Sequence, residues 1–282
     1  MKNKNQLALF QLLGLPEGLP FVLFCSLLGS LVSEASMLST IALSFTANLA
    51  IYCFAQVYKH ISNAPEDALA PSKADPNPIS YGMVGLRPAR FALFSALLIG
   101  VISSFLLSSI NIVLAFSSIL LTMALFHPNI RFSNHLLLGF NQHHWIYGGI
   151  FLLSSIFANR THPEVIEFLF PLLFITSLYL LFRLEESRTE LPQSQAAAFW
   201  RILFASIALV AAAVTFILLK PVPFWTVALW VFLTAVQLSI NFSSRSESSL
   251  HQPLYLFKVF EISGAASFLV YLIFVFINTL MS

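Results

Sequence analysis

The first residues that could carry chemistry follow a long apolar run that ends near residue 58. Lys59 and His60 could act as a cation pair for an anionic head group or a diphosphate, and Asn63 and Asp67 offer oxygen atoms that could ligate a metal ion. Each also has a structural interpretation, because Lys59 can snorkel and His60 can lie at the membrane interface. Asp67 follows Pro65, so its charge could instead stabilise a helix start.

A second polar segment, residues 184–199, contains three carboxylates and one guanidinium group. Glu186 and Glu190 are four residues apart, so on a helix they would share a face and could reach one ion. Glu185 is a further candidate ligand. Arg188 lies between the carboxylates, where it weakens a metal site but could bind an anionic substrate.

Two smaller groups have a functional and a structural interpretation. His143, His144 and Trp145 could bind a metal, a tetrapyrrole or a quinone head group, but adjacent helical side chains point about 100° apart, which favours interfacial anchoring. Glu261 lies in an apolar run, where a carboxylate is a candidate functional group. Lys258 precedes it by three residues, so the two could instead form a structural ion pair.

The composition indicates the elements that must position these residues. The chain is 58% hydrophobic and only 9% charged over 282 residues, and its apolar runs match the length that spans a ~30 Å hydrocarbon layer. This pattern predicts an all-α polytopic membrane protein and shows no second, soluble domain. Cys25 and Cys53 lie inside apolar runs and predict neither a disulfide nor a metal site. Nine spanning helices are expected, at 15–33, 37–58, 91–109, 111–127, 144–159, 165–183, 200–219, 223–241 and 256–280.

The distribution of Lys and Arg predicts the orientation. A cytoplasmic N-terminus puts twelve basic residues on the cytoplasmic side and only Arg160 and Lys220 on the other. The C-terminus is then on the opposite side, and all four long polar loops, 59–90, 128–143, 184–199 and 242–255, are cytoplasmic. The basic residues form no patch that indicates nucleic-acid binding.

The two polar loops with carboxylates follow the second and sixth expected helices. This spacing suggests one domain, residues 1–282, built from two similar halves at about 1–143 and 144–282 around a cavity that opens to the cytoplasm. Function is expected at that mouth, because loops are where a membrane bundle can display polar groups. The protein is expected in a bacterial inner membrane, with the lipid bilayer as its surroundings.

The sequence resembles the UbiA superfamily of intramembrane prenyltransferases. The run EDALAPSKADPNPISYGMV at 66–84 resembles the loop in which an Asp closes the first motif and an Asn-Pro-Ile phrase precedes the third helix. The segment ALFHPNIRFSN at 124–134 resembles the phrase that ends the family's fourth helix, with a Pro and then a basic residue. The resemblance covers nearly the whole chain and is strongest between residues 44 and 134.

The resemblance implies Asp-rich motifs that bind Mg²⁺, and the Mg²⁺ in turn binds the diphosphate of an isoprenoid donor. The family's first motif, Asn-Asp-x-x-Asp-x-x-x-Asp, aligns with Lys59, His60, Asn63 and Asp67, so only the last Asp is kept. The second motif should lie in residues 182–194, where the Asp pair is replaced by Glu residues. The candidate substrate-binding residues are Lys59, His60, Asn63, Lys73, Arg131 and Arg188.

The leading expectation is a UbiA-like membrane protein with lost or altered Mg²⁺-dependent prenyl transfer. It would bind an isoprenoid, quinone or pigment-like lipid, or act as a subunit of a membrane complex. The alternative is an active prenyltransferase that uses Mg²⁺ held by Asp67 with Glu185, Glu186 or Glu190. Such an enzyme would move a polyprenyl or phytyl-type chain from a diphosphate donor to a hydrophobic or aromatic acceptor.

Overall fold

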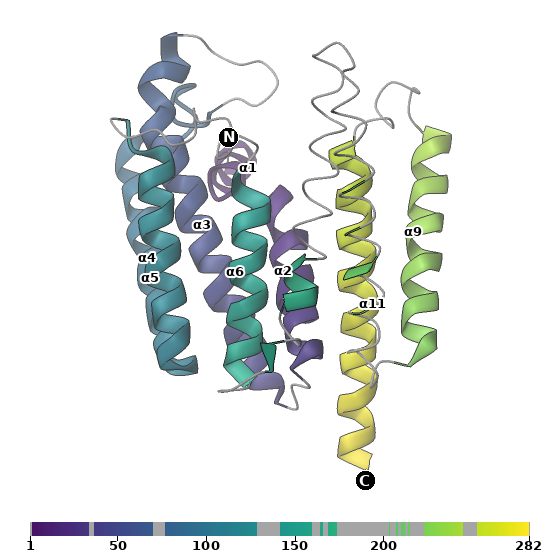
Figure 1. Cartoon of the computed structure of the whole chain (residues 1–282). Coiled ribbons are helices and arrows are strands. Elements are labelled where there is room, and N and C mark those ends of the chain that lie inside the picture. The colour runs from purple at the N-terminus through teal and green to yellow at the C-terminus, as the bar shows by residue number, and fades with distance from the viewer. Residues whose placement is uncertain are drawn as a thin grey trace. The chain divides into compact units, whose positions relative to one another are not determined.

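The computed structural model describes residues 2–33, 37–69, 77–128, 142–159, 164–165, 169–173, 203, 207, 210–211, 214, 223–244 and 253–281. Every regular element bounded within these residues is an α-helix (Figure 1). The helices are α1 (Lys2–Leu12), α2 (Leu15–Val32), α3 (Leu38–Leu69), α4 (Leu86–Leu107), α5 (Ser109–Phe126), α6 (Gln142–Asn159), α9 (Phe224–Ser244) and α11 (Pro253–Met281). The all-α prediction is confirmed.

Within the part of the chain that the structure describes, four helices are long and apolar enough to cross a membrane: α3, α4, α5 and the Lys258–Asn278 part of α11. Shorter apolar stretches run over Gly18–Val32, Tyr147–Asn159 and Phe224–Gln237. An 18-residue helix is about 27 Å long, close to the thickness of the hydrocarbon layer. The protein is therefore an integral membrane protein, while the count of nine spans and the orientation of the termini stay predictions.

The predicted ranges for α2, α5, α6, α9 and α11 agree with the structure to within a few residues. The predicted helices at 165–183 and 200–219 fall largely outside the described residues.

Two predicted boundaries next to the first polar segment are wrong. The second spanning helix was expected to end at residue 58, but α3 continues to Leu69 with Pro65 inside it. Pro65 therefore starts no helix; it removes one backbone donor, opposite the carbonyl of Ile61, and the neighbouring Ala64 and Glu66 favour helix.

The other misplaced boundary is the start of α4, expected at residue 91 and found at Leu86. Gly85 precedes the helix in an extended conformation, with φ −71° and ψ 155°. Pro88 lies in the first turn, where a missing N–H removes no intrahelical hydrogen bond. The polar loop between α3 and α4 is thus much shorter than the sequence predicted.

The chain divides into two compact units. Unit 1 consists of residues 1–22 and 42–142, and unit 2 consists of residues 23–41 and 143–282. The helix α2 contributes its first part to unit 1 and its remainder to unit 2. The prediction of a single domain with two similar halves stays a prediction.

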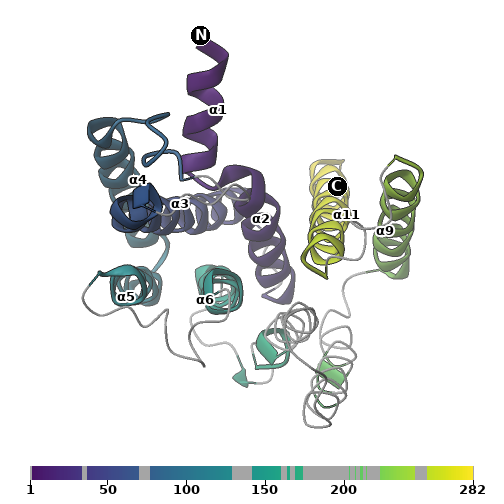
Figure 2. The ribbon, with the colours of Figure 1, turned by 90° about the horizontal axis from the view of Figure 1, so that it is seen from above.

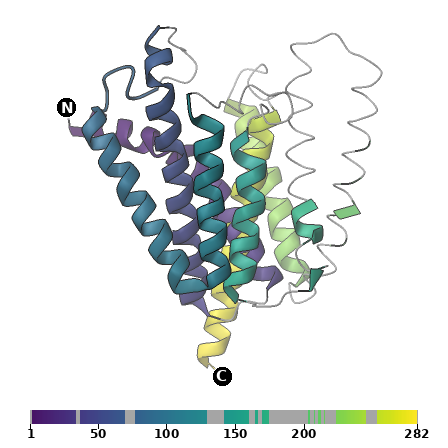
Figure 3. The ribbon, with the colours of Figure 1, turned by 60° about the vertical axis from the view of Figure 1, so that its left-hand side comes forward.

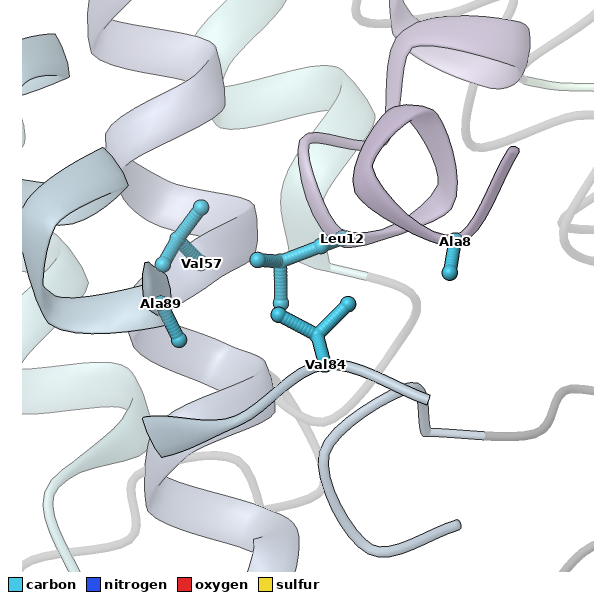
Figure 4. Close-up of a cluster of buried hydrophobic side chains, with 5 residues drawn as sticks. All are labelled: Ala8, Leu12, Val57, Val84 and Ala89. Carbon is cyan, nitrogen blue, oxygen red and sulfur yellow. The ribbon is translucent and has the colours of Figure 1, made fainter. Parts of the chain in front are cut away.

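In unit 1, α1 lies across the direction in which α4 and α5 run (Figures 1 and 3). Its buried side chains Ala8 and Leu12 pack with Val57 of α3, Val84 of the turn before α4 and Ala89 of α4 itself (Figure 4). We call these five residues the α1 core. It fixes the first helix of the chain to the polar end of α3 and to the start of α4.

Unit 2 is held together by aromatic packing. The ring of Phe24, from α2, lies 5.8 Å from Trp230 of α9 and 5.9 and 6.2 Å from Phe260 and Phe268 of α11, measured between ring centroids. The indole Nε1 of Trp230 donates a hydrogen bond to the carbonyl of Phe260 at 3.1 Å. Gly264 allows this packing, because a Cβ there would lie 2.8 Å from the Phe24 ring and 2.9 Å from Trp230. Viewed from above, α9 and α11 lie side by side (Figure 2).

Candidate functional site

The polar end of α3 carries the four first-motif candidates. Because α3 continues to Leu69, Lys59, Asn63 and Asp67 recur at every fourth residue and form one stripe along the helix. His60 lies on the next position and is buried, whereas the other three side chains are half-buried. The structure therefore brings these four residues together on one helix instead of spreading them over a loop.

Asn77 connects this stripe to the turn that follows it. The side chain of Asn77 is buried, and its Nδ2 donates to the carbonyl of His60 at 2.9 Å and to Oδ2 of Asp67 at 2.7 Å. The two contacts reach 17 and 10 residues back along the chain. We call this arrangement the Asn77 latch, since one amide group holds both the backbone and the carboxylate of the helix end.

The residues after Asn77 form a compact turn that presents the amide. Oδ1 of Asn77 accepts from the N–H of Ile79 at 3.0 Å, which is the local bond that Asn side chains commonly make at turns. The carbonyl of Asn77 accepts from Ser80 Oγ at 3.0 Å and from the N–H of Tyr81 at 3.1 Å. Gly82 adopts a φ of 68°, which a residue without a Cβ reaches at no steric cost.

The turn is closed at its far end by the α1 core. The N–H of Val84 donates to the carbonyl of Pro78 at 3.0 Å, and the Val84 side chain packs with Leu12, Val57 and Ala89 (Figure 4). The segment from Asn77 to Val84 is therefore held by hydrogen bonds at one end and by apolar contacts at the other. Both ends are attached to α3, at residues that flank Lys59.

Asp67 is the one carboxylate that the resemblance retains in the first motif. One of its oxygens is used in the latch, and an Asn amide on a carboxylate is a common way to fix a side chain in place. Within the described residues no group of three His, Cys, Asp or Glu side chains could share a metal ion. This part of the chain on its own does not fit the Mg²⁺ site that the resemblance implies.

The remaining candidates of the polar loops lie outside the described residues: Lys73, Arg131, Glu185, Glu186, Arg188 and Glu190. Their roles stay predictions. His143, His144 and Trp145 lie in the first turn of α6, with side chains outside the description. Glu261 is buried in α11 and Lys258 is half-buried one turn earlier. Their predicted ion pair stays a prediction.

Asn77 is a site residue that sequence reasoning did not single out. It was noted as part of the Asn-Pro-Ile phrase, and the Asn-Pro pair signals the start of a turn. That signal is local. It carries no information about which distant carbonyl or carboxylate the amide will contact.

No model of a known protein family matches the sequence, and no curated protein matches it. Solved structures do match. The apo structure of a UbiA homolog from Aeropyrum pernix K1 aligns with a TM-score of 0.61 and 18% identity, over 89% of this chain and 96% of that one. A structure of digeranylgeranylglyceryl phosphate synthase aligns with a TM-score of 0.61 and 15% identity, over 96% of this chain and 98% of that one. The resemblance inferred from the sequence is thus confirmed in three dimensions: the chain has the fold of the UbiA superfamily.

Proposed function

We propose that this membrane protein binds an isoprenoid or related lipophilic molecule through an anionic head group at the polar end of α3. Mg²⁺-dependent prenyl transfer is lost or altered in this proposal. The observation that supports it is the Asn77 latch, in which Asp67, the retained carboxylate of the first motif, ties the loop to the helix. The UbiA fold supports the class of ligand.

Lys59 and Asn63 favour an anion over a cation at their part of the stripe, because Asp67 lies eight residues from Lys59 and is hydrogen-bonded to Asn77. Lys59 supplies a full positive charge and three donors, and Asn63 supplies an amide donor. A diphosphate or a similar group can accept hydrogen bonds from both. A Mg²⁺ ion, in contrast, requires oxygen ligands and is repelled by a neighbouring ammonium group.

The fold similarity to digeranylgeranylglyceryl phosphate synthase favours a second candidate, an active prenyltransferase. In that case Asp67 would hold Mg²⁺ together with Glu185, Glu186 or Glu190. The metal would neutralise the departing diphosphate of a polyprenyl or phytyl-type donor. The two candidates differ in the role of one carboxylate, so they can be separated by substitution.

The first experiment measures binding of geranylgeranyl diphosphate to the full chain in lipid nanodiscs, with Mg²⁺ and with EDTA. We expect binding in EDTA, weakened roughly tenfold or more by Lys59→Ala, because a hydrogen bond to a charged group is lost. Arg90→Ala is the matched control, since this exposed cation lies outside the stripe. Binding that requires Mg²⁺ and is unaffected by Lys59→Ala would contradict the proposal.

The second experiment separates the latch from a metal ligand. Asp67→Asn keeps an oxygen that can accept from Asn77 but removes the charge that a metal needs. Asn77→Asp keeps the acceptor for Ile79 but removes the donor to Asp67 and His60. We expect Asp67→Asn to retain ligand binding and Asn77→Asp to weaken it. Mg²⁺-dependent turnover of the prenyl diphosphate that Asp67→Asn abolishes would establish the second candidate instead.

A further inference from the structure

A separate cavity lies in unit 1, between α1, α3 and α4. Its volume is about 590 Å³, within the roughly 300–1,000 Å³ range of ligand pockets. Leu9 and Leu13 form one wall at the α1 end, and Phe91 and Ile99 of α4 form another. Among its lining side chains, only Thr46 and Ser95 carry a hydroxyl group, so the surface is suited to a hydrocarbon.

The spacing of the lining residues sets the shape of this cavity. On α4 they recur from Pro88 to Ile99 within one face of the helix. These twelve residues span about 16 Å of helix at 1.5 Å per step, which is about half of a ~30 Å hydrocarbon layer. The cavity therefore has the length of one leaflet, measured from the first turn of α4.

An exposed cation lies next to one end of the cavity lining on α4. Arg87 immediately precedes the lining residue Pro88, and its side chain is exposed. At 3.6 residues per turn, Arg87 points roughly 110° from the centre of the lining face of α4, while Arg90 points roughly 170° away from it. Arg87 is thus the nearer of the two to the lining face, next to the end of the lining at Pro88.

We propose that this cavity holds one acyl chain of an anionic membrane phospholipid, with the phosphate of the lipid near Arg87. The apolar lining, the one-leaflet length and the exposed cation next to Pro88 are the three features that carry the assignment. The site is separate from the stripe on α3, because the lining residues of α3 end at Cys53 and the α1 core at Val57 lies before Lys59. It does not depend on the proposed function.

The test uses the full chain in detergent, with native mass spectrometry to count bound lipids. Phosphatidylglycerol and phosphatidylcholine with the same acyl chains are added separately. Ser95→Trp places an indole on the cavity wall, and we expect it to remove the bound phosphatidylglycerol. Leu98→Trp adds the same ring at an exposed position of α4 that does not line the cavity, and we expect it to bind lipid like the native chain.

The head-group part of the proposal is tested with two arginine variants. We expect Arg87→Ala to reduce the preference for phosphatidylglycerol over phosphatidylcholine about fivefold, the usual effect of one interfacial cation. Arg90→Ala should leave the preference unchanged. Equal preference in the native chain and in Arg87→Ala would overturn the head-group assignment.

Folding of each variant is checked by thermal unfolding in the same detergent. If Ser95→Trp does not fold, Thr46→Trp fills the cavity from the facing wall, where the native side chain is exposed. Phosphatidylglycerol bound equally by the native chain and by a folded cavity-filling variant would show that the lipid lies elsewhere. That result would overturn the proposal.

Discussion

Asn77 in unit 1 and Trp230 in unit 2 each donate a side-chain hydrogen bond to the backbone carbonyl of another segment, but in opposite surroundings. Asn77 lies among polar groups, with Asp67, Ser80 and the backbone of Ile79 as further partners. Trp230 lies among aromatic rings, with its centroid 4.5 Å from Phe260 and 5.2 Å from Phe268. At this point unit 1 is stabilised by specific hydrogen bonds, whereas unit 2 is stabilised by the close packing of aromatic rings.

The largest effect is expected from removing volume in unit 2. Phe24→Ala deletes a fully buried ring that contacts three others, and we expect the free energy of unfolding to fall by about 3–5 kcal/mol. Chemical denaturation in mixed micelles measures this change. Phe276→Ala, at an exposed position of α11, is the control and should change stability by at most about 0.5 kcal/mol. Similar values for the two variants would show that the aromatic cluster does not hold unit 2.

A smaller effect is expected from removing the polar tie in unit 1. Asn77→Ala deletes the donor to His60 and Asp67 and the acceptor for Ile79, at a cost of about 2 kcal/mol. Hydrogen exchange measures the loss of the turn. We expect the amides of Ile79 and Tyr81 to exchange faster in Asn77→Ala than in the native chain. Ser80→Ala is the control, since its hydroxyl makes one bond to the carbonyl of Asn77. An equal loss in both variants would contradict the central role of the amide.

A still smaller effect is expected from changing charge without changing shape. Asp67→Asn keeps an acceptor for Asn77, so the free energy of unfolding should change by less than about 1 kcal/mol. The same denaturation experiment compares it with Asn77→Ala. A loss as large as that of Asn77→Ala would mean that the negative charge, and not the hydrogen-bond geometry, holds the turn.

The smallest effect is expected at a buried hydroxyl group in unit 2. Oγ1 of Thr226 is buried and has no hydrogen-bond partner among the residues that the structure describes. Thr226→Val replaces this hydroxyl with a methyl group of similar shape, so stability should stay the same or rise by up to about 1 kcal/mol. A clear decrease in the denaturation midpoint would show that the hydroxyl makes a bond in the membrane.

Hydrophobic patterning predicted α2, α5, α6, α9 and α11 well because a segment that crosses lipid must be apolar along its length and must satisfy its own backbone. It failed at α3 and α4, where the helices extend beyond the apolar runs. Lys59, Asn63 and Pro65 give a local pattern typical of a loop. The backbone remains helical there, and contacts from Asn77 and Leu12 hold that end of α3. Neither contact is encoded within the segment itself.

The candidate site shows the same division between local and long-range information. The resemblance selected Asp67, and the extension of α3 to Leu69 places it on one helix with Asn63 and Lys59. The partner of Asp67 could not be predicted, because an Asn ten residues later has many possible acceptors and only the folded turn selects one. Sequence therefore identified Asp67 as a candidate and could not indicate what Asp67 contacts.

The position of α1 has a consequence for the order in which the protein is made. Ala8 and Leu12 are synthesised before their packing partners Val84 and Ala89. At about 5–20 residues per second, those partners are added roughly 4–15 s later. During this interval the α1 core is incomplete, so α1 can complete its packing only after the start of α4 has been translated.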